Sequence, residues 1–331
     1  MSDQEINRRT FLARTGLATV AAAIVAESRG AQLFAGQDVV AGVDTAVSNS
    51  VGTAPPRLKA PFNTCDCHMH IYDPARFPIP TQREPPSNGT VANYRQYQKR
   101  IGTTRNIVVT PSNYGTDNAC TLDAIKQLGP NSRGIAVIDP MITDAELKRL
   151  DAGGIRGIRF TIRDDATTAG LAPVETLSKR IADLGWHVQL NVTGAQVVDI
   201  APLLGRLPSV VVLDHMAHLP EPAGPDHPSF GILKGLIDKG RTWVKLSAAY
   251  SNTKIGPPLY PDATKLAQAF VKAAPERLVW GSDWPHPSEK PESKPDDALL
   301  FDLMTSWVAD EKTRHRIFVE NPATLYGFGK G

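Results

Sequence analysis

Short runs of apolar and β-branched residues recur at regular intervals along the chain from residue 64 onward. The runs occupy residues 64–71, 104–110, 133–139, 155–162, 187–193, 210–216, 242–250 and 277–283. Each run has the length of a buried β-strand. Most of the intervening stretches carry apolar residues at helical spacing, as in residues 116–128, 172–184, 229–239, 262–274 and 296–308. Strands that alternate with helices predict βαβ units and a parallel sheet.

The number of these strands predicts how the sheet is arranged. Eight strands within residues 62–331 match a (β/α)8 TIM barrel in count and in size. The alternative is an open, doubly wound sheet, which usually carries a glycine-rich phosphate loop after its first strand. No such loop follows residues 64–71. We therefore expect an α/β fold with a single TIM-barrel domain at residues 62–331.

A barrel also predicts where reactive side chains should gather, because active sites of this fold lie at the carboxyl ends of the strands. Polar residues do occur at or near the ends of the predicted strands. They include His68, His70, Ser112, Arg159, Arg163, Gln189, Asp214, His215, His218, Lys245, Asp283 and His286. This distribution indicates a site at one end of the barrel.

The pair His68 and His70 is the most informative part of this pattern. Residues i and i+2 of a strand point to the same face, so both imidazoles should project together. Asp283 ends the last predicted strand and can meet them only if the sheet closes. By the same parity, Cys65 and Cys67 should face away from the histidines, toward the helical layer.

Composition and charge exclude some classes of function. The chain has 36 basic and 34 acidic residues and a net charge of +2. No basic run indicates a nucleic-acid partner. The three cysteines cannot form a disulfide framework, and we expect Cys65 and Cys67 to be small buried residues.

The first sixty residues have the composition of an export signal followed by a linker. Arg8 and Arg9 precede a short apolar stretch at residues 16–26, which is too short to span a bilayer but suits a signal peptide. We expect a twin-arginine signal peptide at residues 1–31 and a linker at residues 32–61. The protein is then periplasmic, or cytoplasmic if the signal does not function.

Three motifs together carry a family resemblance. Asp66-Cys-His-Met-His70, Asp214-His215 and Trp280-Gly-Ser-Asp-Trp-Pro-His-Pro287 resemble the amidohydrolase superfamily. The likeness is greatest to the branch that contains 2-pyrone-4,6-dicarboxylate lactonase and sulfomuconolactone hydrolase. It spans roughly residues 62–328.

The resemblance implies roles for individual residues. Asp283 and His215 would be catalytic, Arg159 would hold a substrate carboxylate, and Ser112 would contact the substrate. His218 stands where the dicarboxylate lactonase pattern has an arginine a few residues after the histidine. This departure favours a substrate with a different charge. The full set of expected substrate-binding residues is Ser112, Arg159, Arg163, Lys245, His218 and His286.

Lactone hydrolysis gives these residue types a chemical purpose. The reaction needs a base for the attacking water and a group that stabilises the oxyanion. Asp283 suits the first task and His215 the second. His68, His70 and Asp283 also match the three-ligand set of a catalytic zinc site, with His215 as a possible fourth ligand. The number of candidate ligands favours one Zn²⁺. Metal-independent catalysis is the alternative, because the resembled branch contains both a metal-independent lactonase and a zinc-linked one.

The sequence thus predicts a hydrolase that opens a small carboxylated or sulfonated lactone of the muconolactone or pyrone type, as in aromatic compound degradation. Arginine favours such an anion because its guanidinium binds carboxylate or sulfonate in bidentate fashion. Two alternatives remain. The first is a zinc-dependent decarboxylase of an aromatic or unsaturated acid, and the second is a non-catalytic periplasmic ligand-binding barrel. The oligomeric state cannot be predicted from these patterns.

Overall fold

A computed structural model of the protein describes residues 46–80, 84–162 and 171–329. The expected signal peptide at residues 1–31, the first part of the expected linker and Arg163 lie outside these described residues. No helix in the described ranges is long and apolar enough to cross a membrane.

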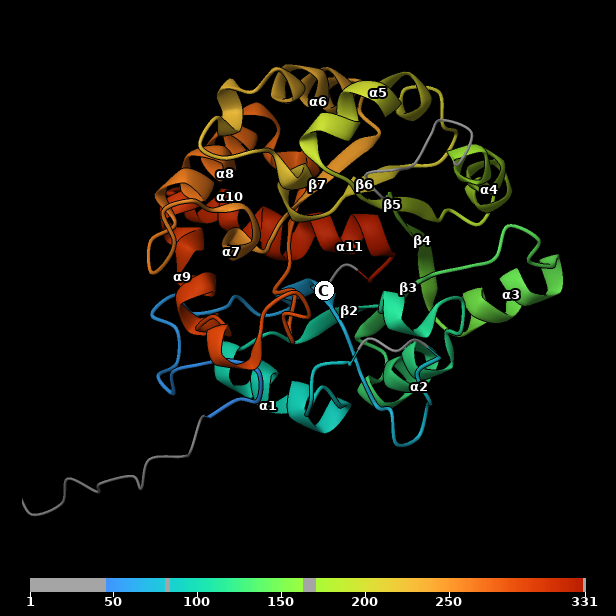
Figure 1. The fold of residues 1–331 in the computed structure, drawn as a ribbon, viewed down its shortest axis with the longest axis horizontal. Helices are drawn as coiled ribbons and strands as arrows, with labels where there is room; N and C mark the ends of the chain where they lie inside the picture. The colour runs from blue at the N-terminus through green and yellow to red at the C-terminus, as the bar shows by residue number, and fades with distance from the viewer. Residues whose placement is uncertain (1–45, 81–83, 163–170, 330–331) are drawn as a thin grey trace, which may run out of the picture. The chain divides into compact units, whose positions relative to one another are not determined.

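Eight parallel strands form one sheet in which each strand pairs with the next along the chain, and helices surround them (Figure 1). The strands are β1 (Cys65–Met69), β2 (Arg105–Val109), β3 (Ser132–Ala136), β4 (Ile155–Thr161), β5 (His187–Asn191), β6 (Val211–Leu213), β7 (Thr242–Leu246) and β8 (Leu278–Trp280). This order confirms the predicted (β/α)8 barrel. Seven of these strands fall within the predicted runs, and β3 begins one residue before its run, at Ser132.

Helices follow or connect the strands throughout the described ranges. The longer ones are α1 (Val91–Ile101), α2 (Ala119–Leu128), α3 (Asp144–Ala152), α4 (Ala172–Ala182), α5 (Gly194–Leu204), α6 (Pro228–Asp238), α8 (Pro261–Ala273) and α9 (Asp297–Trp307). Shorter helices are α7 (Ala249–Asn252), α10 (Glu311–His315) and α11 (Asn321–Tyr326). Side chains fix several of their starts: the hydroxyls of Thr90 and Thr193 accept backbone N–H bonds in capping boxes.

The barrel closes between β1 and β8 through backbone bonds made beyond the end of β8. The Asp283 N–H donates to the His68 carbonyl over 2.8 Å, and the His70 N–H donates to the Trp284 carbonyl over 2.8 Å. The buried Asp66 carboxylate adds a side-chain tie by accepting from the backbone and the hydroxyl of Ser282. We call this junction the closing seam. It joins the predicted histidine pair directly to Asp283.

The lower part of the barrel interior is filled by apolar side chains. They come from strands as far apart as β3 and β6, which are not neighbours in the sheet, so they can meet only across the interior. We call this set the apolar plug; it consists of Cys65, Cys67, Ile107, Val109, Ile135, Val212, Trp243, Val279, Tyr326 and Phe328. Tyr326 and Phe328 lie at and just beyond the end of α11 and complete it.

The orientation predicted for the two cysteines is wrong. Cys65 and Cys67 are buried in the apolar plug and do not face the helices. The reason is a β-bulge: Asp66 pairs with Asn106 and Met69 with Val108, so β1 holds one extra residue in this interval. The bulge shifts the parity, which lets Cys67 and His68 both point inward.

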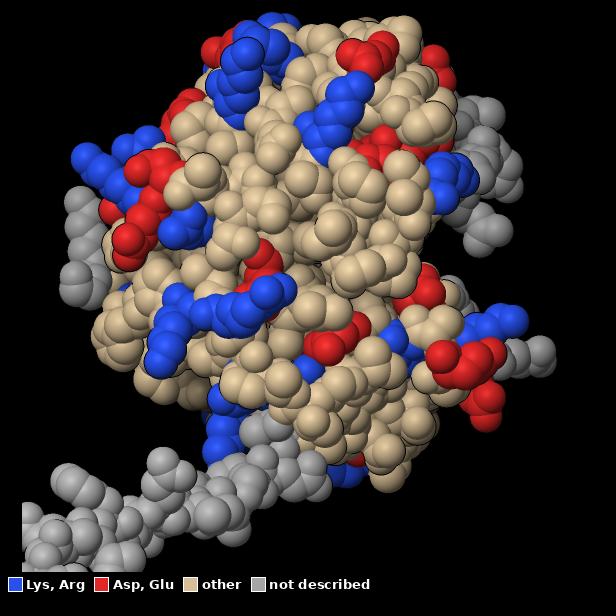
Figure 2. Space-filling view, turned by 90° about the vertical axis from the view of Figure 1, so that its left-hand side faces the viewer, with Lys and Arg blue, Asp and Glu red and all other residues tan. Residues whose placement is uncertain are grey.

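The described part of the expected linker runs against the barrel. Val47 is buried, and the Trp284 ring N–H donates to the Ser48 carbonyl. Arg100 of α1 donates to the Ala54 carbonyl. The surface itself carries mixed charge: on the face drawn in Figure 2, Lys and Arg lie among Asp and Glu, and neither sign covers a large area.

Candidate active site

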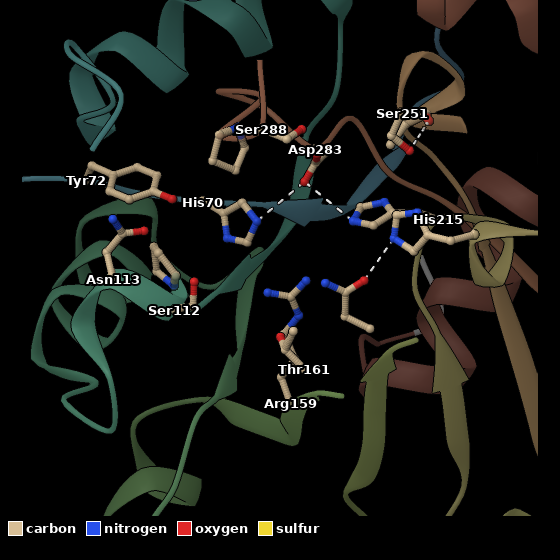
Figure 3. A pocket seen from close by; sticks show the side chains of 15 residues that line it. His70, Tyr72, Ser112, Asn113, Arg159, Thr161, His215, Ser251, Asp283 and Ser288 are labelled. Carbon is tan, nitrogen blue, oxygen red and sulfur yellow. Dashed lines mark hydrogen bonds and ion pairs between the residues drawn. The ribbon is translucent and has the colours of Figure 1, made fainter. Parts of the chain in front are cut away.

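A cavity of about 270 Å³ opens at the carboxyl end of the barrel (Figure 3). Its walls combine imidazole, hydroxyl, amide, guanidinium and carboxylate groups. The lining residues are His70, Tyr72, Pro111, Ser112, Asn113, Arg159, Thr161, Asn191, His215, His218, Ala248, Ser251, Asp283, Pro287 and Ser288. The site therefore lies at the end of the barrel that the sequence indicated.

Three imidazoles surround one carboxylate oxygen at the inner end of this cavity. Asp283 Oδ1 lies 3.4 Å from His68 Nε2, 3.4 Å from His70 Nε2 and 3.8 Å from His215 Nε2. The Nε2 atoms of His68 and His70 are 3.2 Å apart. All four side chains are almost completely buried. The structure thus brings the four principal predicted residues together.

The backbone at these positions adopts a conformation that residues other than glycine rarely take. Asp283 has φ of 63° and His215 has φ of 49°, and the left-handed turn continues through His218. Such conformations cost free energy and persist where the surroundings enforce them, which is common at functional sites. Gly281 serves the same arrangement, because a Cβ atom there would lie 2.7 Å from the Cβ of His68.

Hydrogen bonds to Nδ1 orient the rings. His70 Nδ1 donates to the Val109 carbonyl over 2.8 Å, which leaves a lone pair on Nε2. His215 Nδ1 lies 2.9 Å from the Ser247 hydroxyl. His68 Nδ1 lies 3.2 Å from Asp214 Oδ1 and 3.1 Å from the Lys245 ammonium. Each ring therefore turns its Nε2 atom toward Asp283.

A buried ionic layer lies beneath the imidazoles. Asp214 accepts from Arg159 Nε over 2.9 Å, and the Lys245 Nζ atom lies 3.4 Å from its other oxygen. Lys245 also donates to Gln189 Oε1 over 2.7 Å. Burial would raise the pKa of the Asp214 carboxyl, but its contacts with His68, Lys245 and Arg159 outweigh burial and hold this pKa well below its usual range. Burial lowers the pKa of Lys245.

The same forces set the protonation of the reacting groups. Burial alone would raise the pKa of Asp283, but His215, His70 and His68 outweigh it and hold this pKa well below its usual range. Burial lowers the pKa of His215 to about 4. Burial and the nearby Lys245 charge hold the pKa of His68 well below its ordinary value. At neutral pH the site therefore offers an ionised carboxylate beside the neutral imidazoles of His68 and His215, which suits a base and hydrogen-bonding groups.

The predicted substrate-binding residues fall into three groups. Ser112, Arg159 and His218 line the cavity, and His218 Nε2 is 2.9 Å from Asn191 Oδ1. Lys245 and His286 are fully buried and lie outside the cavity lining, Lys245 below His68 and His286 behind Asp283. Arg163 is not among the described residues.

Sequence reasoning assigned no role to two residues that contact the core of the site. The Tyr250 hydroxyl donates to Asp283 Oδ2 over 2.6 Å. Asp214 contacts His68, Arg159 and Lys245, as described above. A signal existed for each of them, because Asp214 directly precedes His215 and Tyr250 follows the polar end of β7.

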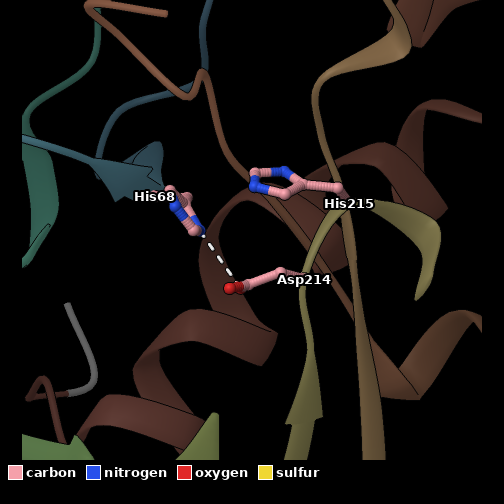
Figure 4. A group of neighbouring side chains, drawn as sticks. All are labelled: His68, Asp214 and His215. Atoms are coloured by element: carbon pink, nitrogen blue, oxygen red, sulfur yellow. Dashed lines mark ion pairs between the residues drawn. The ribbon is translucent and has the colours of Figure 1, made fainter. Parts of the chain in front are cut away.

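His68, His70 and Asp283 have a geometry that fits a metal ion. Their ligand atoms are 3.2–3.4 Å apart, and donors held about 2.1 Å from a tetrahedral zinc lie roughly 3.4 Å from each other. A second group of possible ligands is formed by His68, Asp214 and His215 (Figure 4). The second group is less suited to a cation because the Lys245 ammonium already lies against its His68 and Asp214 atoms.

Comparison with known proteins agrees with this geometry. An amidohydrolase family model matches residues 65–328. The chain is 32% identical to the 2-pyrone-4,6-dicarboxylate hydrolase of Comamonas testosteroni, covering 82% of this chain and 92% of that one. It is 30% identical to the 4-sulfomuconolactone hydrolase of Rhizobium radiobacter, covering 87% and 97%.

A solved structure gives the same result for the fold. It is a probable 2-pyrone-4,6-dicarboxylic acid hydrolase from Acinetobacter baumannii with citric acid bound. It aligns with a TM-score of 0.70 at 26% identity, covering 81% of this chain and 100% of that one. The family match spans most of the described barrel and includes the residues that meet at the cavity. This chain belongs to the amidohydrolase family.

Proposed function

We propose that the protein is a hydrolase that opens a small anionic lactone by attack of water. The observation that carries this proposal is the cluster of three imidazole Nε2 atoms around Asp283 Oδ1. The Arg159 guanidinium points into the same cavity, where Figure 3 shows it with His70, His215 and Asp283. The two relatives named above support the choice of substrate class, since both are named for lactone-type anions.

In the proposed reaction Asp283 is the general base. Water attacks the lactone carbonyl carbon while Asp283 takes the proton of the water. The ring C–O bond then breaks, and the proton passes from Asp283 to the leaving alkoxide, so that one water is consumed and one carboxylic acid and one hydroxyl form. The new acid then ionises and releases one proton to solvent. His215 stabilises the oxyanion if the Ser247 hydroxyl donates to its Nδ1 and leaves a proton on Nε2.

Arg159 is the proposed anchor for the substrate anion. Its Nε donates to Asp214 over 2.9 Å, which fixes the plane of the guanidinium. The outer nitrogens can then pair with a carboxylate or sulfonate. Hydroxyl and amide groups of Ser112, Asn113 and Thr161 line the adjoining wall and can bind ring oxygens or hydroxyls of the substrate.

We further propose one Zn²⁺ at this site, held by His68, His70 and Asp283. A zinc ion there would polarise the lactone carbonyl and lower the pKa of a nearby water. The carbonyl acceptor behind His70 and the carboxylate behind His68 are the contacts that orient histidine ligands. Lys245 works against the ion, because its ammonium lies 3.1 Å from His68 Nδ1.

A screen of carboxylated, sulfonated and neutral lactones tests the function. Purified protein should release one proton and one ring-opened acid per turnover with an anionic lactone, and the neutral ring should react poorly. Release of carbon dioxide from an unsaturated or aromatic acid would instead support the decarboxylase. Saturable binding without turnover would support the ligand-binding barrel.

Metal analysis of the same preparation tests the zinc proposal. One equivalent of zinc, loss of activity on chelation and recovery on readdition are the expected results. Full activity in protein stripped of metal would contradict the proposal and favour catalysis by the side chains alone.

Export to the periplasm is proposed from the N-terminal sequence alone. Replacing Arg8 and Arg9 together by lysine should keep a full-length reporter fusion in the cytoplasm, while the unchanged fusion reaches the periplasm. Equal periplasmic yields of the two fusions would contradict a twin-arginine route.

A further inference from the structure

A hydrogen-bonded chain lies directly behind Asp283, on the side away from the cavity. The Tyr250 hydroxyl donates to Asp283 Oδ2 over 2.6 Å and lies 3.0 Å from His286 Nδ1. His286 Nε2 lies 3.1 Å from Asp297 Oδ2. We call Tyr250, His286 and Asp297 the backing chain. Its members come from α7, from the loop after β8 and from the first turn of α9.

His286 and Asp297 of the backing chain are buried, Tyr250 is partly buried, and none of the three lines the cavity of the site. His286 is 0% and Asp297 2% exposed. The chain can therefore influence the reaction only through Asp283.

Donor and acceptor chemistry gives the backing chain a direction. The Tyr250 hydroxyl has a single proton, so while it donates this proton to Asp283 Oδ2 its oxygen accepts from His286 Nδ1. Asp297 Oδ2 contacts the other ring nitrogen, Nε2, and so fixes the plane of the imidazole. A distance of 2.6 Å between Tyr250 and Asp283 is typical of a hydroxyl that donates to a charged oxygen. The Lys294 ammonium donates to the carbonyls of Pro285 and His286 and so anchors the loop that carries this ring.

The contact with Tyr250 gives the two carboxylate oxygens of Asp283 different partners. Oδ2 is occupied by the tyrosine, whereas Oδ1 faces the three imidazoles. Without the hydroxyl the carboxylate would be free to turn about its Cβ–Cγ bond, since only Oδ1 would retain fixed partners. A reacting group displaced by about 1 Å can lose on the order of 100-fold in rate.

We propose that Tyr250 is a positioning residue that holds Asp283 in its reactive orientation, with His286 and Asp297 fixing the hydroxyl from behind. The inference rests on the proposed function, because it takes Asp283 as the base. It explains why His286, although close to the site in sequence, lies outside the cavity.

The test uses Tyr250→Phe with Tyr94→Phe as a matched control. Tyr94 is fully buried, whereas Tyr250 is partly buried, and the Tyr94 hydroxyl likewise donates to a buried carboxylate, Asp66 Oδ2, over 3.0 Å. Both variants lose one hydroxyl–carboxylate bond, but Asp66 does not line the cavity. Tyr250→Phe should lower kcat about 10- to 100-fold with little change in KM, whereas Tyr94→Phe should lose stability and keep its kcat.

A double variant separates positioning from a general loss of packing. Asp297→Asn should lower kcat less than Tyr250→Phe does, and adding it to Tyr250→Phe should cause no further loss, because both act on the same hydroxyl. Additive losses, a change confined to KM, or equal kcat values for the two tyrosine variants would each overturn the proposal.

Crystal structures of the two tyrosine variants provide a readout that does not depend on turnover. The Asp283 carboxylate should rotate or occupy two orientations in Tyr250→Phe and remain fixed in Tyr94→Phe. An unchanged carboxylate in Tyr250→Phe would overturn the positioning role even if the wild type opened no lactone. Failure of the wild type on every lactone would instead count against the proposed function.

Discussion

The upper and lower halves of the barrel interior are built on the same strands but differ completely in chemistry. Below lies the apolar plug, and above it lie the ionic layer and the imidazoles. On β7 the change occurs between Trp243 and Lys245, and at the end of β6 it occurs between Val212 and Asp214. Two residues along a strand therefore separate a packing role from a chemical one.

The apolar plug in the lower half strengthens the electrostatic interactions in the upper half. Tightly packed apolar side chains exclude water from beneath the site, so charges above them interact in a medium of low polarity. Such charges are costly unless they are paired. Asp214 meets this requirement through Arg159, Lys245 and His68. The plug stabilises the fold, while the ionic layer above it orients the reacting groups.

The largest expected effect on activity comes from replacing the proposed base, Asp283, in the upper half of the barrel interior. Asp283→Asn keeps the size of the side chain and removes its charge, so kcat should fall about 10³- to 10⁴-fold, near the upper limit for general-base catalysis. Steady-state kinetics with the best lactone measures the loss. A variant that retains a tenth of the wild-type kcat would exclude Asp283 as the base.

The converse change weakens the plug and leaves the chemistry intact. Ile135 is fully buried in the apolar plug, so Ile135→Ala should lower the free energy of unfolding by about 2–5 kcal/mol. Urea unfolding measures this loss. Ile135→Val should lose only about 0.5–1.5 kcal/mol, and kcat should stay unchanged in both. A large fall in kcat in the folded Ile135→Ala protein would show that the halves are not separate.

A third change acts on the substrate-binding wall of the upper half. Arg159→Lys keeps the charge but loses the planar pair of donors, so KM for a carboxylated lactone should rise about 10- to 100-fold. The matched control is Arg156→Lys on the same strand, because Arg156 pairs with Asp151 outside the cavity. Equal KM values for the two variants would argue against Arg159 as the anion anchor.

The smallest effect concerns His187, which lies at the boundary between the two halves. Burial lowers the pKa of this histidine to about 3, and neither ring nitrogen has a hydrogen-bond partner among the described residues. Because the folded pKa lies below the unfolded one, its contribution to stability is present above about pH 6.5 and is lost as the pH falls toward 3.

This pH dependence can be measured by urea unfolding. Between pH 7 and pH 5, His187 should account for about 2 kcal/mol of lost stability in the wild type, and His187→Gln should not show that part of the loss. His315→Gln, at an exposed histidine, should behave like the wild type. The same pH slope in His187→Gln as in the wild type would contradict the assignment.

The sequence predicted the barrel because apolar runs and helical spacing are local signals, and each strand uses them independently. It predicted the neighbourhood of the site because barrel topology gathers strand ends. The predicted strands were too long where the site begins: β6 ends at Leu213 and β8 at Trp280, since His215 and Asp283 leave the sheet in left-handed conformations. Tertiary contacts enforce these conformations, and local propensity does not encode them.

Side-chain depth was beyond the reach of sequence patterns. Because of the bulge in β1, Cys65 and Cys67 point into the barrel interior and not toward the helices as predicted. Nothing in the local sequence marks the extra residue. Lys245 lies near the end of a predicted strand and His286 shares a motif with Asp283, yet both are fully buried outside the cavity. How far a polar residue lies from the opening depends on the stagger of the strands, which only the closed barrel fixes.

The closing seam has a consequence for the order in which the molecule assembles. A hydrogen bond between Ser282 and Asp66 helps to hold this seam together, and the two residues are 216 positions apart in sequence. Contacts between such distant segments bear the largest loop-closure entropy and tend to form late. A nascent or refolding chain would hold most of its strands before the base reaches the histidines. Recovery of catalytic activity should therefore lag behind recovery of secondary structure during refolding. The rate at which activity returns would then report the rate of the final folding step.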